Sequence, residues 1–175
     1  IVSCWKLISD TFEMIGKPIM PILELEAKAD EKVWSMYELG MTATLNQVDG
    51  EWATGLIMDY KPKNLRELSM FVACLRPFFN SNRAEFIARK VHSTGSKHLD
   101  EILKDTNGYI LFQESLMKYF EWLGVSPAES IGLIKKISKK KIKQKDFDDL
   151  EDRIRKTWIE KTGSEDMFDC TWKMI

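Results

Sequence analysis

Lysine is concentrated in one short segment of this sequence. Seven of the eleven residues from 135 to 145 are lysine, although the whole 175-residue chain has a formal net charge of −1. A row of ammonium groups on a helix suits phosphate, because like charges that repel in the free protein gain partners and release counterions on binding. The segment therefore favours a site for nucleotide phosphates or for a nucleic-acid backbone, made of Lys135, Lys136, Lys139, Lys140 and Lys141. A solvated face, partly neutralised by the acidic residues at 146–152, stays open as the alternative.

The helix that would present these lysines begins at a clear signal. Residues 126–129, Ser-Pro-Ala-Glu, predict a capping box with proline at the first helical position. Three isoleucines then share one face, and the lysines fall on another face if the helix continues as far as Lys143. The sequence therefore predicts one capped helix that points several lysines outward together.

Arg76 is a second candidate for phosphate binding. It stands before Pro77 at the end of a strongly apolar predicted helix, and its planar guanidinium can hold phosphate in a bidentate way. The alternative is that Arg76 caps the C-terminal end of that helix.

Gln113 and Glu114 interrupt a predicted apolar helix that follows Gly108. Placing two polar side chains there costs stability unless they have partners. They therefore either hold a buried polar network together or face a ligand.

Several kinds of chemistry have no support in the residue pattern. The sequence contains no glycine-rich phosphate loop and no nucleophile elbow. His92 and His98 have no cysteine or carboxylate at ligand spacing, so we expect ordinary surface histidines and no metal site. The three cysteines are widely spaced, which indicates reduced thiols. No apolar stretch reaches the length of a membrane span. We expect binding, and no catalysis by this segment alone.

The predicted fold is mainly α, a cluster of eight to ten short helices with few or no strands. Hydrophobic residues make up 44% of the chain and include six Trp and nine Phe. The helical spacing of the aromatic residues fits a core, so most of them are assigned to packing. Two lobes are expected, divided near residues 92–97, with segments 1–91 and 92–175. Short extended segments are expected near Ile22 and Thr44. Helices are predicted at residues 3–15, 30–39, 49–60, 64–75, 83–91, 97–106, 109–123, 126–143 and 147–161, with a last short one after Ser164.

Three groups of residues, read in order, resemble the region after the palm in the α subunit of the C-family replicative DNA polymerases of bacteria and phages. The first is Gly-Met-Thr-Ala-Thr at 40–44 with Asn-Gln-Val-Asp at 46–49. The second runs from Tyr-Lys-Pro at 60–62 to Leu-Arg-Pro at 75–77. The third and most specific is Ile-Leu-Lys-Asp-Thr at 102–106, Gly108, and Phe-Gln-Glu at 112–114, which continues into the lysine segment.

The resemblance implies a function for the lysine segment. In that family this region belongs to the fingers, whose basic residues face the incoming nucleoside triphosphate and the template. Lys135 then replaces the second arginine of a family pair, and Ile134 replaces the first. An isoleucine cannot contact phosphate, so either Lys136 compensates or triphosphate binding is weaker.

The resemblance also implies what this segment lacks. The catalytic aspartates of the palm precede Ile1 in the family, and with Mg²⁺ they carry out nucleotidyl transfer. We therefore expect a DNA-directed DNA polymerase as the parent protein and a segment that binds no cofactor and is inactive alone. The expected partners are primer–template DNA and deoxynucleoside triphosphates, with other replisome subunits bound through the parent chain, in the cytoplasm of a bacterium or a phage-infected host.

Two alternatives to the polymerase interpretation follow from the lysines alone. A non-catalytic helical module could bind an acidic protein partner. Association with an anionic membrane is less favoured, because the helix has no exposed bulky apolar face.

Overall fold

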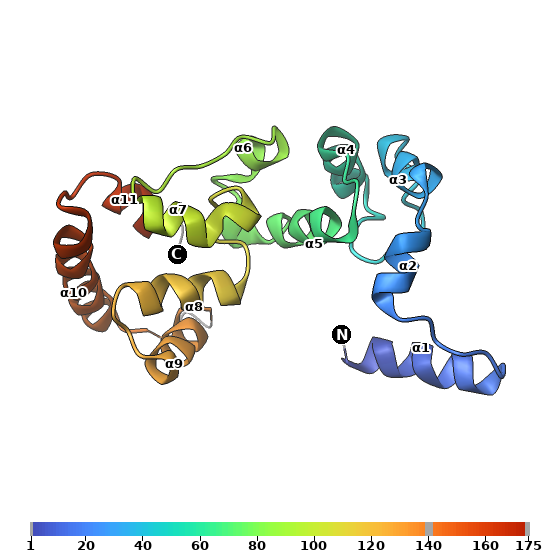
Figure 1. Ribbon diagram of the computed structural model, residues 1–175, viewed down its shortest axis with the longest axis horizontal. Helices are drawn as coiled ribbons and strands as arrows, with labels where there is room; N and C mark the ends of the chain where they lie inside the picture. Colours follow the sequence, from blue (N-terminus) through green and yellow to red (C-terminus); the bar gives the residue numbers. More distant parts are fainter. Residues whose placement is uncertain (1, 139–141, 174–175) are drawn as a thin grey trace. The chain divides into compact units, whose positions relative to one another are not determined.

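The computed structural model describes residues 2–138 and 142–173 (Figure 1). The mainly-α prediction is confirmed: the described residues form eleven α-helices and two short 3-10 helices, and they contain no strand. The α-helices are α1 (Val2–Met14), α2 (Ile22–Lys28), α3 (Glu31–Glu38), α4 (Glu51–Tyr60), α5 (Leu65–Cys74), α6 (Arg83–Ile87), α7 (Lys97–Leu103), α8 (Gln113–Trp122), α9 (Pro127–Ser138), α10 (Gln144–Thr162) and α11 (Phe168–Trp172). The 3-10 helices are η1 (Pro77–Phe79) and η2 (Lys104–Thr106).

The chain divides into two compact units, Ile1–Leu68 and Ser69–Ile175, and the boundary falls within α5. This is a division by packing. The predicted functional division at residues 91 and 92 stays a prediction.

The first unit has a small core. Ala53, Ile57 and Tyr60 are the buried residues of α4, and the fully described helices α2 and α3 bury none of theirs. Asp30 caps α3 as expected, because its carboxylate accepts from the backbone amides of Lys32 and Val33 at 3.0 and 3.3 Å.

The expectation of an extended segment near Ile22 is wrong, since α2 covers it. Leucine, glutamate, alanine and lysine fill this stretch, and all four are strong helix formers. Pro21 stands at the N-cap, and Glu26 accepts a hydrogen bond from the Leu65 amide at 3.0 Å. Local propensity therefore decided this element.

The second unit contains the larger core. Helix α8 packs against both α7 and α9 and lies between them in Figure 1. Aromatic rings form two clusters in this unit: Phe79, Phe86 and Tyr109 meet edge to face at 5.5–5.6 Å, and Trp158 meets Phe168 at 6.0 Å. The assignment of these aromatic residues to packing agrees with their burial.

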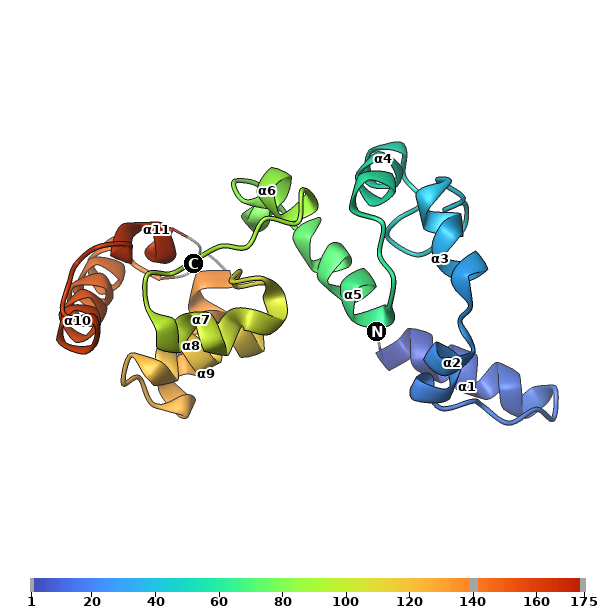
Figure 2. The ribbon, with the colours of Figure 1, turned by 45° about the horizontal axis from the view of Figure 1, so that its top comes forward.

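Helix α11 lies beside α10 (Figure 2), and Arg155 of α10 contacts it. Arg155 donates to Glu151 at 2.7 Å within α10 and to Glu165 and Asp169 at 2.6 and 2.9 Å beyond it. Its guanidinium also lies 4.3 Å from the centroid of the Phe168 ring. This network fixes the C-terminal turn of the unit.

Two predicted helices have different bounds. The helix expected at 83–91 stops at Ile87, and the helix expected after Gly108 begins only at Gln113. Residues 109–111 are buried and not helical, because Asn107 and Gly108 both take left-handed backbone conformations that end the preceding turn.

Candidate nucleic-acid interface

Lys135 and Lys136 lie in the last turn of α9, and both are exposed. The opposite side of the helix packs inward, since Ile134 is only 5% exposed. The first turn of α9 is fixed twice: the Glu129 amide donates to the Ser126 hydroxyl at 3.3 Å, and the Glu129 carboxylate accepts from Arg153 of α10 at 2.6 Å. A firmly seated helix therefore presents these two lysines.

The prediction that one helix carries the whole lysine segment is wrong. Helix α9 ends at Ser138, and Lys143 is the N-cap of α10 with an extended backbone (φ −74°, ψ 147°). Lys139, Lys140 and Lys141 lie outside the described residues. Among the described lysines of the segment, Lys135 and Lys136 therefore belong to α9, whereas Lys143 and Lys145 belong to the start of α10.

The acidic residues of α10 do not neutralise the described lysines of this segment. Within the part of the chain that the structure describes, neither Lys135 nor Lys136 forms an ion pair with a carboxylate. Asp148 accepts instead from Gln144 at 2.8 Å, and Glu151 from Arg155. The solvated-face alternative stays open for these two lysines, and their role in binding stays a prediction.

Arg76 is exposed at the turn after α5, where it is the N-cap of η1. The end of α5 is held by a different residue, because Arg83 donates to the carbonyls of Cys74 and Arg76 at 2.8 and 3.0 Å. Burial raises the pKa of Cys74 to about 12, while the charge of Arg83 acts in the opposite direction. The Cys74 thiol is therefore protonated and unreactive at neutral pH.

Sequence reasoning missed Arg83. No spacing rule connects it with Cys74, and the turn at Pro77 brings the two together.

Gln113 and Glu114 are exposed in the first turn of α8. The alternative of a buried polar network is therefore wrong for them, because the helix begins at Gln113 and its first turn faces solvent. Gln113 and Glu114 lie at the N-terminal end of α8, and Lys135 and Lys136 lie at the C-terminal end of α9. The connection between the two helices lies at the other end of each.

The most specific sequence motif, residues 102–108, builds a turn. Thr106 is only 6% exposed, and its hydroxyl donates to the Tyr109 carbonyl at 2.5 Å. Gly108 has φ +83°, and a Cβ there would lie 1.8 Å from the His92 carbonyl oxygen. Only glycine fits, so this motif positions α8 and the chain before it.

The first motif, at residues 40–49, is also structural. Thr42 is buried, and its hydroxyl lies 2.5 Å from that of Thr54 in α4, which in turn donates to the Val48 carbonyl at 3.1 Å. These bonds fasten the loop to the helix that follows it.

The two histidines both contact aromatic rings. His92 lies 5.5 Å from the Tyr109 ring, and exposed His98 stacks on Trp122 at 5.8 Å. Among the described residues, no group of three His, Cys, Asp or Glu side chains could hold a metal ion. The search for membrane spans, over the same residues, found no helix with the required length and hydropathy.

The fold and the surface together define a class of protein segment. Its described part is all-helical, it exposes lysines at the end of a helix, and its sequence motifs form turns. Residues 5–162 match the model of the family described as the bacterial DNA polymerase III alpha subunit finger domain. The chain belongs to this family.

Individual relatives agree with the family match. The chain is 27% identical over 143 residues to DNA polymerase III subunit alpha of Thermotoga maritima and 29% identical over 156 residues to that of Aquifex aeolicus. It is 31% identical over 119 residues to the Bacillus subtilis protein of the same name. These matches cover 76%, 77% and 65% of this chain but only 15%, 13% and 11% of the relatives. The chain therefore spans a small part of the length of these relatives.

Proposed function

We propose that this chain acts as the fingers part of a DNA-directed DNA polymerase in DNA replication. In this role Lys135 and Lys136, with Lys139, Lys140 and Lys141, contact the phosphates of an incoming deoxynucleoside triphosphate and of the primer–template. The observation that carries the proposal is the pair of exposed lysines on the fixed helix α9, to which no described carboxylate is paired. Exposed ammonium groups without a protein partner gain most from a phosphate.

Ile134 leaves two possibilities for triphosphate binding, compensation by Lys136 or weaker binding. It is buried against the rest of the unit, so the place where the resemblance puts the first arginine of a pair faces the core. Lys136 is exposed on the same turn. We assign the missing phosphate contact to Lys136. Arg76 would add a guanidinium, and Gln113 and Glu114 would support the site as exposed polar groups.

The chemistry of nucleotide transfer is assigned to the remainder of the polymerase. Mg²⁺ held by palm carboxylates supplies activation of the primer hydroxyl and stabilisation of the leaving pyrophosphate. This chain contributes binding and positioning, so alone it should bind DNA without extending a primer. Its place of work would be the cytoplasm of a bacterium or of a phage-infected cell, together with other replisome subunits.

The test is the binding of the 175-residue chain to fluorescent primer–template DNA at increasing salt. Counterion release predicts an affinity that falls steeply as salt rises, by about 0.9 logarithmic units per phosphate contact for each tenfold increase in salt. Absence of binding, or an affinity insensitive to salt, would contradict the proposal. An acidic protein that remains bound after nuclease treatment would instead support the interaction-module alternative.

A further inference from the structure

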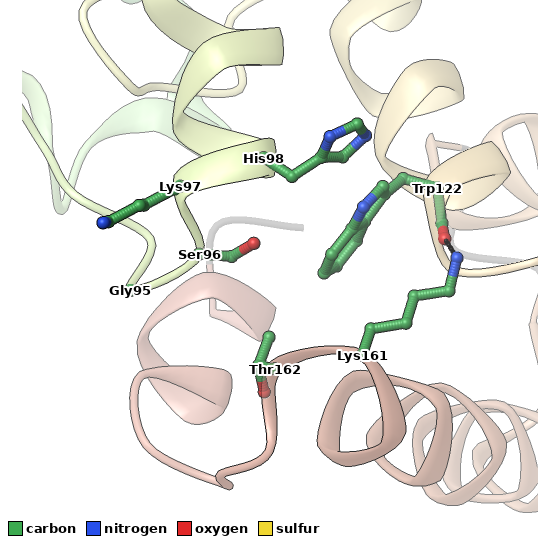
Figure 3. Close-up of a pocket in the computed structure, with 7 residues that line it drawn as sticks. All are labelled: Gly95, Ser96, Lys97, His98, Trp122, Lys161 and Thr162. Carbon is green, nitrogen blue, oxygen red and sulfur yellow. Dashed lines mark hydrogen bonds between the residues drawn. The ribbon is translucent and has the colours of Figure 1, made fainter.

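A surface hollow of about 640 Å³ lies in the second unit, apart from the lysine segment. Its walls come from three separate stretches: residues 95–98, Trp122 at the end of α8, and Lys161 with Thr162 at the end of α10 (Figure 3). Neither the family resemblance nor the sequence motifs assign a role to these residues.

A pair of aromatic rings forms one wall. The exposed His98 ring and the Trp122 ring are stacked, with centroids 5.8 Å apart and planes inclined by 24°. Trp122 in turn meets the buried Trp158 edge to face at 5.7 Å. The outer ring is therefore accessible, while the inner ring is anchored in the core. Such a pair offers a rigid surface on which another planar group can stack.

The lysines that line the hollow, Lys97 and Lys161, carry positive charge. The Lys161 ammonium donates to the Trp122 carbonyl and lies 5.3 Å from the indole centroid. Lys97 is exposed at the rim, and Figure 3 shows its side chain extending away from the rings. No acidic residue is among the described residues that line the hollow. A ligand with both a planar ring and a negative charge satisfies this combination.

The loop that forms the first wall is pre-organised. The Asp100 carboxylate accepts from the Thr94 amide and hydroxyl, both at 2.7 Å, and from the Ser93 hydroxyl at 2.8 Å. Gly95 packs closely against Met167, because a Cβ added to Gly95 would lie only 2.8 Å from the Met167 side chain. Little conformational freedom has to be lost when a ligand binds here.

We infer that this hollow binds an unpaired nucleotide of single-stranded DNA. The base stacks on the His98–Trp122 pair, and the neighbouring phosphate meets Lys97. Every base has a π-face, so stacking of this kind needs no particular sequence, and nearby cations hold the backbone. An acidic peptide would use the cations but leave the rings without a partner. The inference rests on the proposed function for its DNA ligand, but it concerns a different site.

The test compares two labelled DNA probes over the same series of salt concentrations: oligo-dT, and a blunt duplex of the same length. His98→Ala should weaken binding of oligo-dT about tenfold, the loss of one stacked base, and leave duplex binding unchanged. Lys97→Ala should also weaken oligo-dT binding and reduce its salt slope by about 0.7. Phe78→Ala is the matched control, since Phe78 is an exposed aromatic residue of the same unit that does not line the hollow. Circular dichroism of each variant confirms that the helices are intact.

Four results would overturn the inference: no binding of oligo-dT by the unmodified chain, no effect of His98→Ala, an equal effect on the duplex, or an equal effect of Phe78→Ala. Two further arms separate other ligands. The first arm measures binding of labelled poly-glutamate: if His98→Ala weakens it as much as it weakens oligo-dT binding, the hollow would be assigned to acidic peptides. The second arm adds thymidine monophosphate: if it displaces oligo-dT at equal nucleotide concentration, the hollow would be assigned to free nucleotides. A blunt duplex offers the hollow no unpaired base, so the salt dependence of duplex binding concerns the lysine segment and the two proposals can fail separately.

Discussion

Single residues show which parts of the family resemblance carry structure and which carry surface chemistry. Thr106 and Gly108 shape a buried turn, whereas Lys135 and Lys136 face solvent. Ile134 stands between these two groups, because the resemblance places it at a binding position and the structure places it in the core. The consequences can be measured residue by residue.

Substituting arginine for Ile134 should destabilise the protein. The side chain at this position is buried, and an unpaired guanidinium there loses its hydration, at a cost on the order of 3 kcal/mol. Ile134→Val, which only removes a methyl group, should cost about 1 kcal/mol. Urea denaturation of both variants gives the comparison. An arginine variant that is as stable as the parent and binds triphosphate more tightly would show that the position faces the ligand.

Substituting alanine for Gly108 should cost more than the same change at Gly124. Both glycines have positive φ, +83° and +80°, but only at Gly108 does a Cβ meet backbone. Gly124→Ala should therefore cost about 1 kcal/mol from backbone strain alone. Gly108→Ala should cost about 2 kcal/mol more, because the His92 carbonyl has to move. Equal losses in urea denaturation would mean that the turn has room for a side chain.

At the scale of elements, local signals were sufficient where they were strong. The caps at Asp30 and Ser126 and the glycine stop after α1 gave correct helix starts and ends, since each depends on contacts within a few residues. The failures had different causes: the helix formers of α2 were underestimated near Ile22, whereas the turn at Asn107 and Gly108 delays the start of α8. The extended backbone at Lys143 could not be predicted from a lysine-rich stretch that continues the helical pattern.

The candidate site could be predicted from sequence only in part. The lysine segment and its capped helix are visible in composition and motif. The hollow beside His98 is not, because it joins residues 95–98, 122 and 161–162 through packing of three helices. No spacing in the chain connects them.

The loop at residues 92–96 should weaken at acid pH through Asp100. Burial by itself raises the pKa of this carboxyl, but hydrogen bonds from Thr94 and Ser93, with the nearby His92, outweigh burial and the net pKa lies below its ordinary value. The unfolded chain therefore binds the proton more readily, so this stabilisation is complete above about pH 4 and is lost as pH falls through the lower folded-state pKa.

Asp100→Asn measures this contribution. The difference in free energy of unfolding between parent and variant should be about 1–3 kcal/mol at neutral pH and should shrink below about pH 4. Asp59→Asn, at an exposed position of α4, should show little difference at any pH. A difference for Asp100→Asn that stays constant or grows in acid would contradict the hydrogen-bonding explanation.

At the scale of the whole molecule, the two units differ in how much they bury. The fully described helices α2 and α3 have no buried residue, and large apolar side chains such as Ile22, Leu23 and Leu39 are 60–76% exposed. The second unit buries Trp158, Phe168, Phe120 and Tyr119 completely. Protection of the backbone should follow this difference.

Hydrogen exchange followed by mass spectrometry should therefore separate the units. Amides of α2 and α3 should exchange rapidly in the isolated chain, while those of α8 and α10 should be protected as long as the second unit stays folded. Slow exchange in α2 and α3 would show that the first unit has a stable core of its own.

The salt dependence of DNA binding by a charge variant tests the central claim most directly. The variant replaces Lys135, Lys136, Lys139 and Lys140 by alanine, and the control replaces four exposed lysines elsewhere, Lys63, Lys118, Lys156 and Lys173, with the same change in net charge. If the lysine segment binds DNA phosphates, the slope of log affinity against log salt should become shallower by about 2 to 4 in the variant and change little in the control. Equal slopes in variant and control would show that the segment is an ordinary solvated surface.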